Sequence, residues 1–293
     1  MNNKTPTILI TGANGQLGTT FRAFAVNQPA NHFIFTSKEE LQIDLPAAID
    51  QFFEQHPIDY CINCAAYTAV DQSAIEKEKA FAINATAVGY LAATCKKYTA
   101  TLIHISTDYV FDGLADKPYS EESTMAPVNT YGASKLKGEE LALQNNPDTI
   151  IIRSSWLYAQ NGHNFVKTML RLMKEKDSIN VVNDQVGCPT NAVDLADAIM
   201  QIIHQLPIAN CQLPLILNYA NAGITTWFEF AQAIKEFTGS SCIINPVPTS
   251  QYPTAAKRPQ YTVLDTSKIQ EIFHISIPNW KESLQKCLQR LKV

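Results

Sequence analysis

The feature that most constrains the fold of this chain is a glycine-rich turn, Gly12-x-x-Gly15-x-x-Gly18. An apolar run over 7–11 precedes it and predicts a strand, and the segment 16–26 that follows predicts a helix. Glycines in such a turn allow a sharp bend and let a pyrophosphate approach backbone N–H groups at the positive end of the helix. A strand-to-helix turn with incidental glycines is the alternative. The strand-turn-helix context favours a dinucleotide-binding unit.

The first half of the chain alternates short β-like runs with longer helical patterns. Strands are predicted over 7–11, 32–36, 60–64, 101–106 and 150–153, and helices over 16–26, 47–55, 76–98 and 135–144. The last of these continues the helix that carries Tyr131. Such alternation is typical of a parallel sheet with crossover helices.

The pattern loosens after Trp156. Helices are predicted over 165–174, 192–204, 227–237 and 283–291, strands over 179–182 and 215–219, and a proline-rich loop over 246–259. We therefore expect an α/β fold, with a Rossmann-like doubly wound parallel sheet and a smaller, interleaved C-terminal substrate domain. The expected division assigns 1–156 with 188–219 to an NAD(P)-binding domain and 157–187 with 220–293 to a substrate-binding domain.

Composition excludes several classes of function. The formal net charge of −4 offers no general attraction to nucleic acid or to an anionic membrane, so we expect neither partner. No apolar run approaches the ~18 residues that span a bilayer. Seven scattered cysteines suit free thiols in a reducing compartment, and we expect a cytoplasmic protein. The pair in Cys61-Ile62-Asn63-Cys64 lies in an apolar run that predicts a strand, not a redox or metal site.

The end of the second predicted strand bears on the choice of cofactor. It runs into Thr36-Ser37-Lys38, with no carboxylate there to bind a ribose 2′-hydroxyl, and the lysine and hydroxyls suit a 2′-phosphate. Glu39 and Glu40 lie close to this point in the sequence, and a carboxylate there could bind the ribose 2′-hydroxyl, so NADH also stays possible as the cofactor. We therefore expect NADPH or NADH as cofactor.

Two further segments are candidates for contact with that cofactor. Asp44 could meet the adenine amino group, or it could be the N-cap of a helix before Pro46. Ala65 and Ala66 are small enough to let a cofactor ribose lie against the backbone, or they could reflect close packing. The residues expected to bind the cofactor are Gly12, Gly15, Gln16, Leu17, Gly18, Ser37, Asp44, Leu45, Ala65, Ala66, Tyr67, Tyr131 and Lys135.

Tyr131 and Lys135 lie four residues apart, which places both side chains on one face of a helix. Reduction of a ketone needs a hydride donor beside the carbonyl carbon and a proton donor beside its oxygen. A phenol, with its ordinary pKa of ~10, needs a nearby cation to favour the phenolate, and Lys135 supplies that charge and can hold the nicotinamide ribose. Thr107 would hydrogen-bond the same oxygen. The alternative is an amphipathic helix with a solvated lysine.

His104 is interpreted as a packed strand residue, because no ligand cluster surrounds it.

Longer motifs extend this pattern along nearly the whole chain. They are Asn63-Cys64-Ala65-Ala66-Tyr67-Thr68-Ala69-Val70-Asp71, Ser106-Thr107-Asp108-Tyr109-Val110-Phe111-Asp112-Gly113, Tyr131-Gly132-Ala133-Ser134-Lys135-Leu136-Lys137-Gly138-Glu139, Arg153-Ser154-Ser155-Trp156-Leu157-Tyr158, Asp184-Gln185-x-Gly187-x-Pro189-Thr190 and Lys257-Arg258-Pro259. In this order they resemble the extended short-chain dehydrogenase/reductase family and, within it, the dTDP-4-dehydrorhamnose reductases.

The resemblance implies roles for individual residues. It implies that Thr107, Tyr131 and Lys135 are catalytic. The residues it implies for the substrate are Val70, Thr107, Asp108, Tyr109, Trp156 and Arg258. Arg258 is a candidate for the substrate diphosphate, because a guanidinium matches phosphate geometry. From the residues alone, Trp156 could equally belong to the core, Asp108 could be a turn residue, and Arg258 could be a surface arginine.

The resemblance also implies an activity. It is the NAD(P)H-dependent reduction of the C4 keto group of dTDP-4-dehydro-β-L-rhamnose to dTDP-L-rhamnose, so the expected partner is a dTDP-sugar. Alternatives on the same scaffold are a nucleotide-sugar epimerase or dehydratase, and a non-catalytic NADP-binding regulatory subunit. Some family members join subunits through magnesium bound by glutamates, but the matching positions here are Thr20 and Val193. We therefore expect no metal, and either a monomer or a homodimer.

Overall fold

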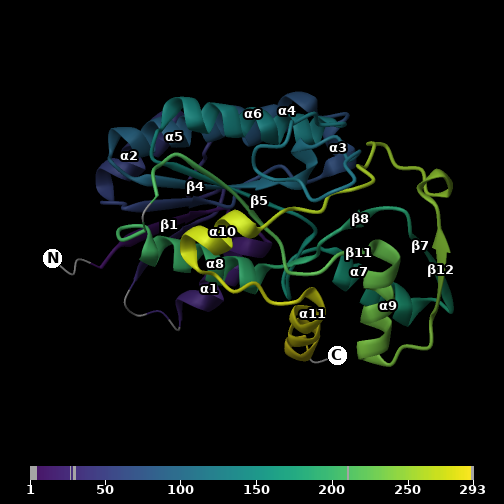
Figure 1. Cartoon of the computed structure of the whole chain (residues 1–293). Helices are drawn as coiled ribbons and strands as arrows, with labels where there is room; N and C mark the ends of the chain where they lie inside the picture. Colours follow the sequence, from purple (N-terminus) through teal and green to yellow (C-terminus); the bar gives the residue numbers. More distant parts are fainter. Residues whose placement is uncertain (1–4, 27, 29–30, 210, 292–293) are drawn as a thin grey trace.

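A six-stranded parallel sheet forms the centre of the computed structural model, which describes residues 5–26, 28, 31–209 and 211–291 (Figure 1). The strands are β1 Thr7–Thr11, β2 His32–Thr36, β3 Tyr60–Asn63, β4 Thr101–Thr107, β5 Thr149–Ser154 and β10 Leu215–Tyr219. Their order is β10-β5-β4-β3-β1-β2, and every pairing is parallel. Because β2 and β3 lie on opposite sides of β1, the winding direction reverses there. Open α/β sheets bind ligands outside the carboxyl ends of the strands at such a point.

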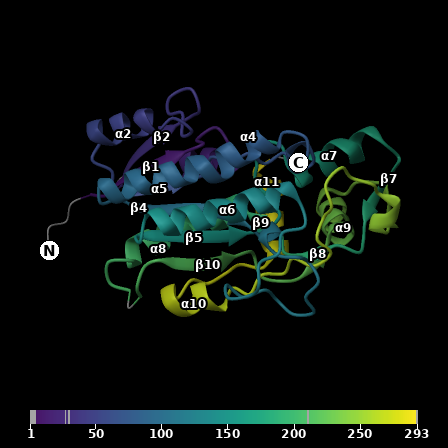
Figure 2. The ribbon, with the colours of Figure 1, turned by 90° about the horizontal axis from the view of Figure 1, so that it is seen from above.

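Helices cover both faces of the sheet, with one layer above it and one below it in Figure 1, and Figure 2 looks down on the upper layer. They are α1 Gln16–Ala25, α8 Ala192–Gln205 and α10 Ser267–Phe273 on one face, and α2 Pro46–Gln55, α5 Ala87–Lys97 and α6 Thr130–Asn145 on the other. Alternate strand residues point to opposite faces, so Ile8 and Ile10 of β1 pack on the first layer and Leu9 on the second. Burial on both faces explains why these strands are continuous apolar runs. The predicted α/β class and doubly wound sheet are confirmed.

The single helix that the sequence predicts over 76–98 is interrupted. α4 (Lys77–Phe81) and α5 are joined by a π-helical turn, η1 (Ala82–Thr86). Such a widened turn inside an α-helix is frequent at functional sites. Apolar periodicity does not distinguish it from regular helix, so the sequence pattern misses it.

A second apolar cluster lies beside the sheet (Figure 1). It contains α7 (Phe165–Glu175), α9 (Trp227–Thr238) and α11 (Trp280–Arg290), with a two-stranded parallel sheet of β7 (Ser178–Val182) and β12 (Ile243–Val247). α9 begins with a reciprocal capping box at its first turn, which fixes where this helix starts.

Two parts of the second half differ from expectation. The sequence predicts a loop over 246–259, but β12 includes Pro246. In a two-stranded sheet both strands are edges, where a missing N–H is tolerated, and Pro246 is exposed. The sequence pattern also misses α10, whose Ile269 and Phe273 complete an apolar layer against the central sheet.

Short elements connect these parts. They are α3 Val70–Ser73, the 3-10 turns η2 Asp108–Val110 and η3 Thr249–Gln251, and the two-residue strands β6 Leu157–Tyr158, β8 Val186–Gly187, β9 Thr190–Asn191 and β11 Thr225–Thr226. β6 pairs with β9, and β8 pairs with β11. Among the described residues, no helix is both long enough and apolar enough to cross a membrane.

Candidate active site

The glycine turn brings the end of β1 against the loop that follows β3. Gly12 has a φ of +64°, and a Cβ there would lie 2.6 Å from the backbone nitrogen of Ala65. A Cβ on Gly18 would lie 2.5 Å from the carbonyl oxygen of Gly12. Both positions therefore require glycine. Gly15 is the N-cap of α1 and has no side chain to bond to the first N–H groups of the helix, so these can face an anion.

A cavity of about 390 Å³ lies beside this turn. The predicted cofactor residues that line it are Gly12, Gly15, Ser37, Asp44, Ala65, Ala66 and Tyr67. Lys38, Glu39 and Lys79 line it as well. A backbone cradle that a Cβ would fill, small residues after β3 and two lysines together fit a pyridine dinucleotide.

Other predicted cofactor residues do not line this cavity. Leu17 is buried in the apolar core, and Leu45 is the exposed N-cap of α2. The Gln16 side-chain oxygen accepts a hydrogen bond from Asn164 Nδ2 at 3.0 Å, which ties α1 to the start of α7. Because Leu45 occupies the N-cap, the helix-cap alternative for Asp44 is wrong.

α6 carries both Tyr131 and Lys135 close to the end of β4. Its N-cap is Asn129, whose side chain accepts from the N–H of Gly132 at 2.9 Å. A Cβ on Gly132 would lie 2.1 Å from the carbonyl oxygen of Tyr109. A glycine at this position therefore lets the first turn of α6 contact the turn after β4 and brings the tyrosine to it.

Residues of η2 and the end of β4 surround the Tyr131 phenol. Thr107 Oγ1 donates to Asp108 Oδ1 at 2.9 Å and accepts from the N–H of Tyr109 at 3.2 Å. The rings of Tyr109 and Tyr131 meet edge to face, with centroids 5.7 Å apart. Burial raises the pKa of Tyr131 to about 12; the Thr107 hydroxyl opposes this rise and the Asp108 carboxylate adds to it. Tyr131 is therefore a phenol at neutral pH, the form that can donate a proton.

Asp108 has an unusual environment for a carboxylic acid. The side chain is buried, and its Oδ2 has no hydrogen-bond partner among the described residues. Burial raises the pKa of Asp108 to about 7, although the nearby hydroxyls of Thr262 and Thr107 act against it. A buried oxygen without a partner is costly, so this one is available to a ligand hydroxyl.

Lys135 is buried, with 2% of its surface exposed, so the alternative of a solvated lysine is wrong. Its Nζ donates to the carbonyl oxygen of Ile105 at 2.6 Å and lies 3.2 Å from His104 Nε2. Burial lowers the pKa of Lys135 to about 8, against the effects of Glu139 and Cys64. His104 is also fully buried, and its pKa lies well below the usual value because of burial and then because of Lys135. The sequence indicated only packing for His104 and missed this contact.

A second buried cation, Arg153 of β5, pairs with Glu139, which lies one turn after Lys135 on α6. Glu139 accepts from Arg153 Nη2 at 2.7 Å and from its Nε, and both side chains are buried. Arg153 Nη1 also donates to the carbonyl oxygen of Glu121. Arg153 therefore has a bidentate ion partner, whereas the hydrogen-bond partners of Lys135 are a neutral carbonyl and an imidazole. Breaking the Arg153 pair would cost about 3–5 kcal/mol of stability.

Asn84 of η1 is a site residue that sequence reasoning missed. Its side chain bonds to the backbone N–H and carbonyl of Tyr67 at 2.8 and 3.0 Å and donates to Ser134 Oγ at 3.0 Å. It thereby fixes the loop after β3 against α6, and this loop forms one wall of the cavity. An asparagine within the apolar helical pattern around it is the sequence signal that could have found it.

Trp156 packs on the second apolar cluster. Its φ is +46°, which is rare for a bulky residue. The indole stacks on Trp227 with ring centroids 3.6 Å apart, and a Cβ on Gly187 would lie 2.6 Å from the ring. The side chain is half-buried, so part of the indole stays accessible.

Arg258 is held by Asp71. Its Nη1 and Nη2 reach the two carboxylate oxygens at 3.0 and 2.7 Å, and Asp71 Oδ1 also accepts from the N–H of Ala256. The arginine side chain is 17% exposed, so the protein covers most of it. Hydrogen bonds from Arg258 lower the pKa of Asp71. The pair ties the segment 256–258 to α3, next to Val70.

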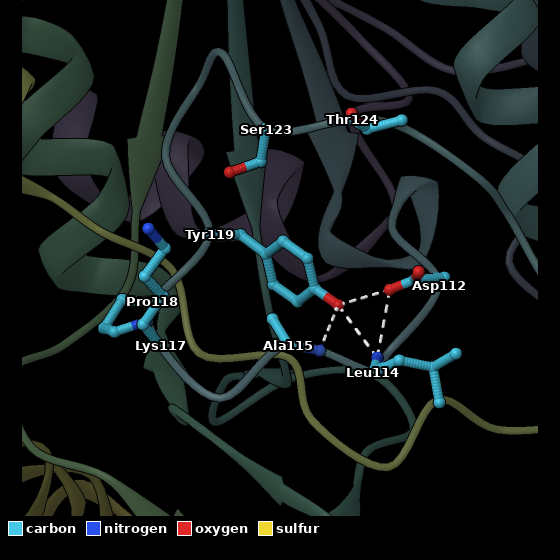
Figure 3. A pocket seen from close by; sticks show the side chains of 8 residues that line it. All are labelled: Asp112, Leu114, Ala115, Lys117, Pro118, Tyr119, Ser123 and Thr124. Carbon is cyan, nitrogen blue, oxygen red and sulfur yellow. Dashed lines mark hydrogen bonds between the residues drawn. The ribbon is translucent and has the colours of Figure 1, made fainter.

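Arg258 and Lys257 line a further cavity of about 440 Å³, together with Asp112, Leu114 and Gln260. A neighbouring cavity of about 300 Å³ shares Asp112 and Leu114 with it and surrounds Tyr119 (Figure 3). The Tyr119 hydroxyl donates to Asp112 Oδ1 at 2.6 Å and accepts from the N–H groups of Leu114 and Ala115. The hydrogen-bonding capacity of this hydroxyl is therefore satisfied within the loop. Within the described residues, no group of three or more His, Cys, Asp or Glu side chains could hold a metal ion.

The fold and the residues at the carboxyl edge of its sheet are those of the extended short-chain dehydrogenase/reductase class. A family model described as the RmlD substrate binding domain matches residues 6–293. The chain belongs to this RmlD family.

Relatives match the chain over nearly its full length. It is 36% identical to the dTDP-4-dehydrorhamnose reductase of Aggregatibacter actinomycetemcomitans, over 95% of this chain and 97% of that one. It is 38% identical to the spore coat polysaccharide biosynthesis protein SpsK of Bacillus subtilis, over 96% of each. The solved structure of dTDP-4-dehydrorhamnose reductase from Bacillus anthracis, in complex with NADP, is 35% identical, with a TM-score of 0.92 over 98% of this chain and 100% of that one.

Proposed function

We propose that this chain is a dTDP-4-dehydrorhamnose reductase that uses NADPH to reduce the C4 keto group of dTDP-4-dehydro-β-L-rhamnose, giving dTDP-L-rhamnose. The observation that carries the proposal is the buried phenol of Tyr131 beside Thr107, in a fold whose glycine turn after β1 borders a cavity that fits a dinucleotide. A family member of this name is 36% identical to this chain over nearly its full length, and a solved relative holds NADP.

Different residues of the chain have separate roles in the proposed reaction. The cofactor, when bound, supplies a hydride, and the backbone at Gly12 and Ala65 with the side chain of Lys38 would hold it. Tyr131 donates its proton to the oxygen of the carbonyl as negative charge develops there. The Thr107 hydroxyl, which donates to Asp108 Oδ1 in the protein without substrate, would turn its proton to the same oxygen.

Contacts to the sugar follow from groups that lack a full set of partners. Asp108 Oδ2 is buried and unpartnered within the described residues, so a sugar hydroxyl would complete its hydrogen bonding. Tyr109 and the accessible part of Trp156 offer aromatic faces and edges to the apolar side of a deoxysugar. Val70 begins α3 beside the Asp71–Arg258 pair.

The diphosphate of the substrate is assigned to Arg258. A guanidinium can bind a phosphate through two parallel hydrogen bonds, and here the same fork binds the Asp71 carboxylate. A diphosphate and Asp71 would therefore compete for this fork or share it. Lys257 lines the same cavity and adds positive charge.

We further propose that 1–156 with 188–219 binds the cofactor and that 157–187 with 220–293 binds the substrate. The second apolar cluster, formed by α7, α9 and α11, supports this division, whereas α10 packs on the central sheet. A cytoplasmic location and a monomer or homodimer remain part of the proposal.

The experiment follows the absorbance of NADPH, and in parallel of NADH, with dTDP-4-dehydro-β-L-rhamnose, and identifies the sugar product by NMR. We expect one NADPH consumed for each dTDP-L-rhamnose formed. An epimerase or dehydratase would convert a nucleotide sugar without net consumption of NADPH. A regulatory subunit would bind NADPH and turn over no sugar nucleotide. Either of these results would overturn the proposal.

A further inference from the structure

His104 of β4 lies between Asn63 of β3 and Lys135 of α6. Its Nδ1 is 3.1 Å from Asn63 Nδ2, and its Nε2 is 3.2 Å from Lys135 Nζ. All three side chains are buried away from bulk solvent. A neutral imidazole has one N–H donor and one acceptor nitrogen. The two contacts of the ring are therefore linked, and fixing one of them fixes the other.

The orientation of the Asn63 amide is set by its surroundings. Its Oδ1 accepts from the Thr11 hydroxyl at 2.7 Å and from the backbone N–H of Ala65 at 3.2 Å. A backbone N–H can only donate, so the amide oxygen faces Ala65 and the amide nitrogen faces His104. Asn63 therefore donates to Nδ1 of His104, and the proton of the neutral imidazole is on Nε2.

The Nε2–H of His104 points at Lys135 Nζ, which must then accept. An ammonium has three donors and no acceptor, whereas a free amine has two donors and a lone pair. The free amine satisfies both of its contacts, because it accepts from His104 and donates to the carbonyl of Ile105 at 2.6 Å.

The other ionisable groups around Lys135 do not require it to be charged. Glu139 on the same helix is neutralised by Arg153. Cys64, after β3, stays a thiol because burial raises its pKa. Tyr131 stays a phenol, since its pKa is raised to about 12. Burial of the amine itself acts in the same direction, lowering the pKa of Lys135 to about 8.

We propose that His104 is a positioning residue, which donates its Nε2–H to Lys135, holds that side chain in place and favours its free amine over its ammonium in the protein without cofactor. The test by kcat rests on the proposed function, because it takes Lys135 as catalytic, a role that the family resemblance implies. Tyr131 is a phenol whichever charge the amine carries, because burial raises its pKa to about 12.

The first test compares denaturant unfolding of the cofactor-free wild type and Lys135→Met from about pH 7 to 10. The unfolded lysine keeps its proton up to the ordinary lysine pKa of 10.5, whereas the folded one loses it near pH 8. Folding therefore releases a proton between these values, and wild type gains stability over Lys135→Met as the pH rises. The ratio of their unfolding constants should change by about tenfold per pH unit in this window. A ratio independent of pH would mean that the folded lysine is charged, and would overturn the proposal.

The second test separates His104 from burial alone. In His104→Gln the amide reaches the place of Nε2 and can turn its oxygen toward Lys135, where it accepts from an ammonium. The contact stays, but the pH dependence measured against the matching double variant with Lys135→Met should weaken. An unchanged dependence would mean that burial alone sets the charge of Lys135, and His104 would have no part.

The third test concerns position. In His104→Asn the shorter amide reaches only the place of Nδ1, so the Asn63 contact is kept and the Lys135 contact is lost. We expect kcat to fall at least about tenfold in His104→Asn, and about threefold or less in His104→Gln. Equal kcat values in the two variants would contradict the positioning role. Because the unfolding measurements need no substrate, they remain decisive if the sugar assignment fails.

Discussion

The cofactor side and the substrate side of the candidate site are built by different means. Around the cavity beside β1, shape comes from the backbone, where Gly12 and Gly18 leave no room for a Cβ. On the substrate side, shape comes from side-chain pairs such as Trp156 on Trp227, and Arg258 on Asp71, 187 positions away in sequence. Substitutions on the first side should therefore act through steric exclusion, and those on the second through lost partners.

The largest expected effect lies where the two sides meet. Tyr131→Phe removes the proton donor but keeps the ring, so we expect kcat to fall about 10³-fold while the Kd for NADPH stays within about threefold. Steady-state NADPH oxidation and a fluorescence titration of cofactor measure the two quantities. Tyr109→Phe is the matched control, since it keeps the edge-to-face contact, and should lose far less. Activity of Tyr131→Phe within tenfold of wild type would remove the tyrosine from the mechanism.

The backbone character of the cofactor side is tested by two glycines of one motif. In Gly18→Ala a Cβ would meet Gly12 O and Ala13 Cα at 2.5 and 2.6 Å, and we expect about 3 kcal/mol lower stability in urea unfolding. In Gly15→Ala the nearest atom is 3.2 Å away, so the loss should stay near 1 kcal/mol. This second variant should instead bind NADPH about tenfold more weakly, because Gly15 lines the cavity. Equal loss of stability in both would contradict the steric account.

The substrate side is tested through its ion pair. Arg258→Ala should raise KM for the sugar nucleotide about 10- to 30-fold, with kcat within about threefold, because it removes a charge-assisted fork from the diphosphate. Asp71→Asn leaves the arginine in place and removes its anionic competitor, so KM should stay the same or fall. If Asp71→Asn raised KM as much as Arg258→Ala does, the pair would be structural and the diphosphate assignment would be wrong.

The smallest expected effect concerns the 2′-phosphate. Lys38 is an exposed cation on the cavity wall, so Lys38→Ala should weaken NADPH binding about three- to tenfold and leave NADH binding unchanged. Raising the salt concentration should reduce the difference, since exposed charges are screened. Equal weakening for both cofactors would place the lysine elsewhere on the dinucleotide.

The sequence predicts the central sheet well because its strands are buried on both faces and so form continuous apolar runs. It predicts the cavity beside β1 because only glycine fits there. The π-helical turn at Ala82–Thr86 escapes prediction, since its residues follow an ordinary helical pattern. The roles of His104 and of the Asp71–Arg258 pair depend on contacts between distant segments, and residue type alone does not indicate them.

The route of the chain between the two apolar clusters has a further consequence. After β5 the chain enters the second cluster with α7, returns to the sheet with α8 and β10, leaves again with α9, returns with α10 and ends in the second cluster with α11. Neither apolar cluster is therefore formed by one continuous segment of the described chain. Folding must therefore join segments far apart in sequence, which is intrinsically slow. The candidate site takes residues from the central sheet and Trp156 from beside the second cluster, so it can be complete only once the whole chain has assembled.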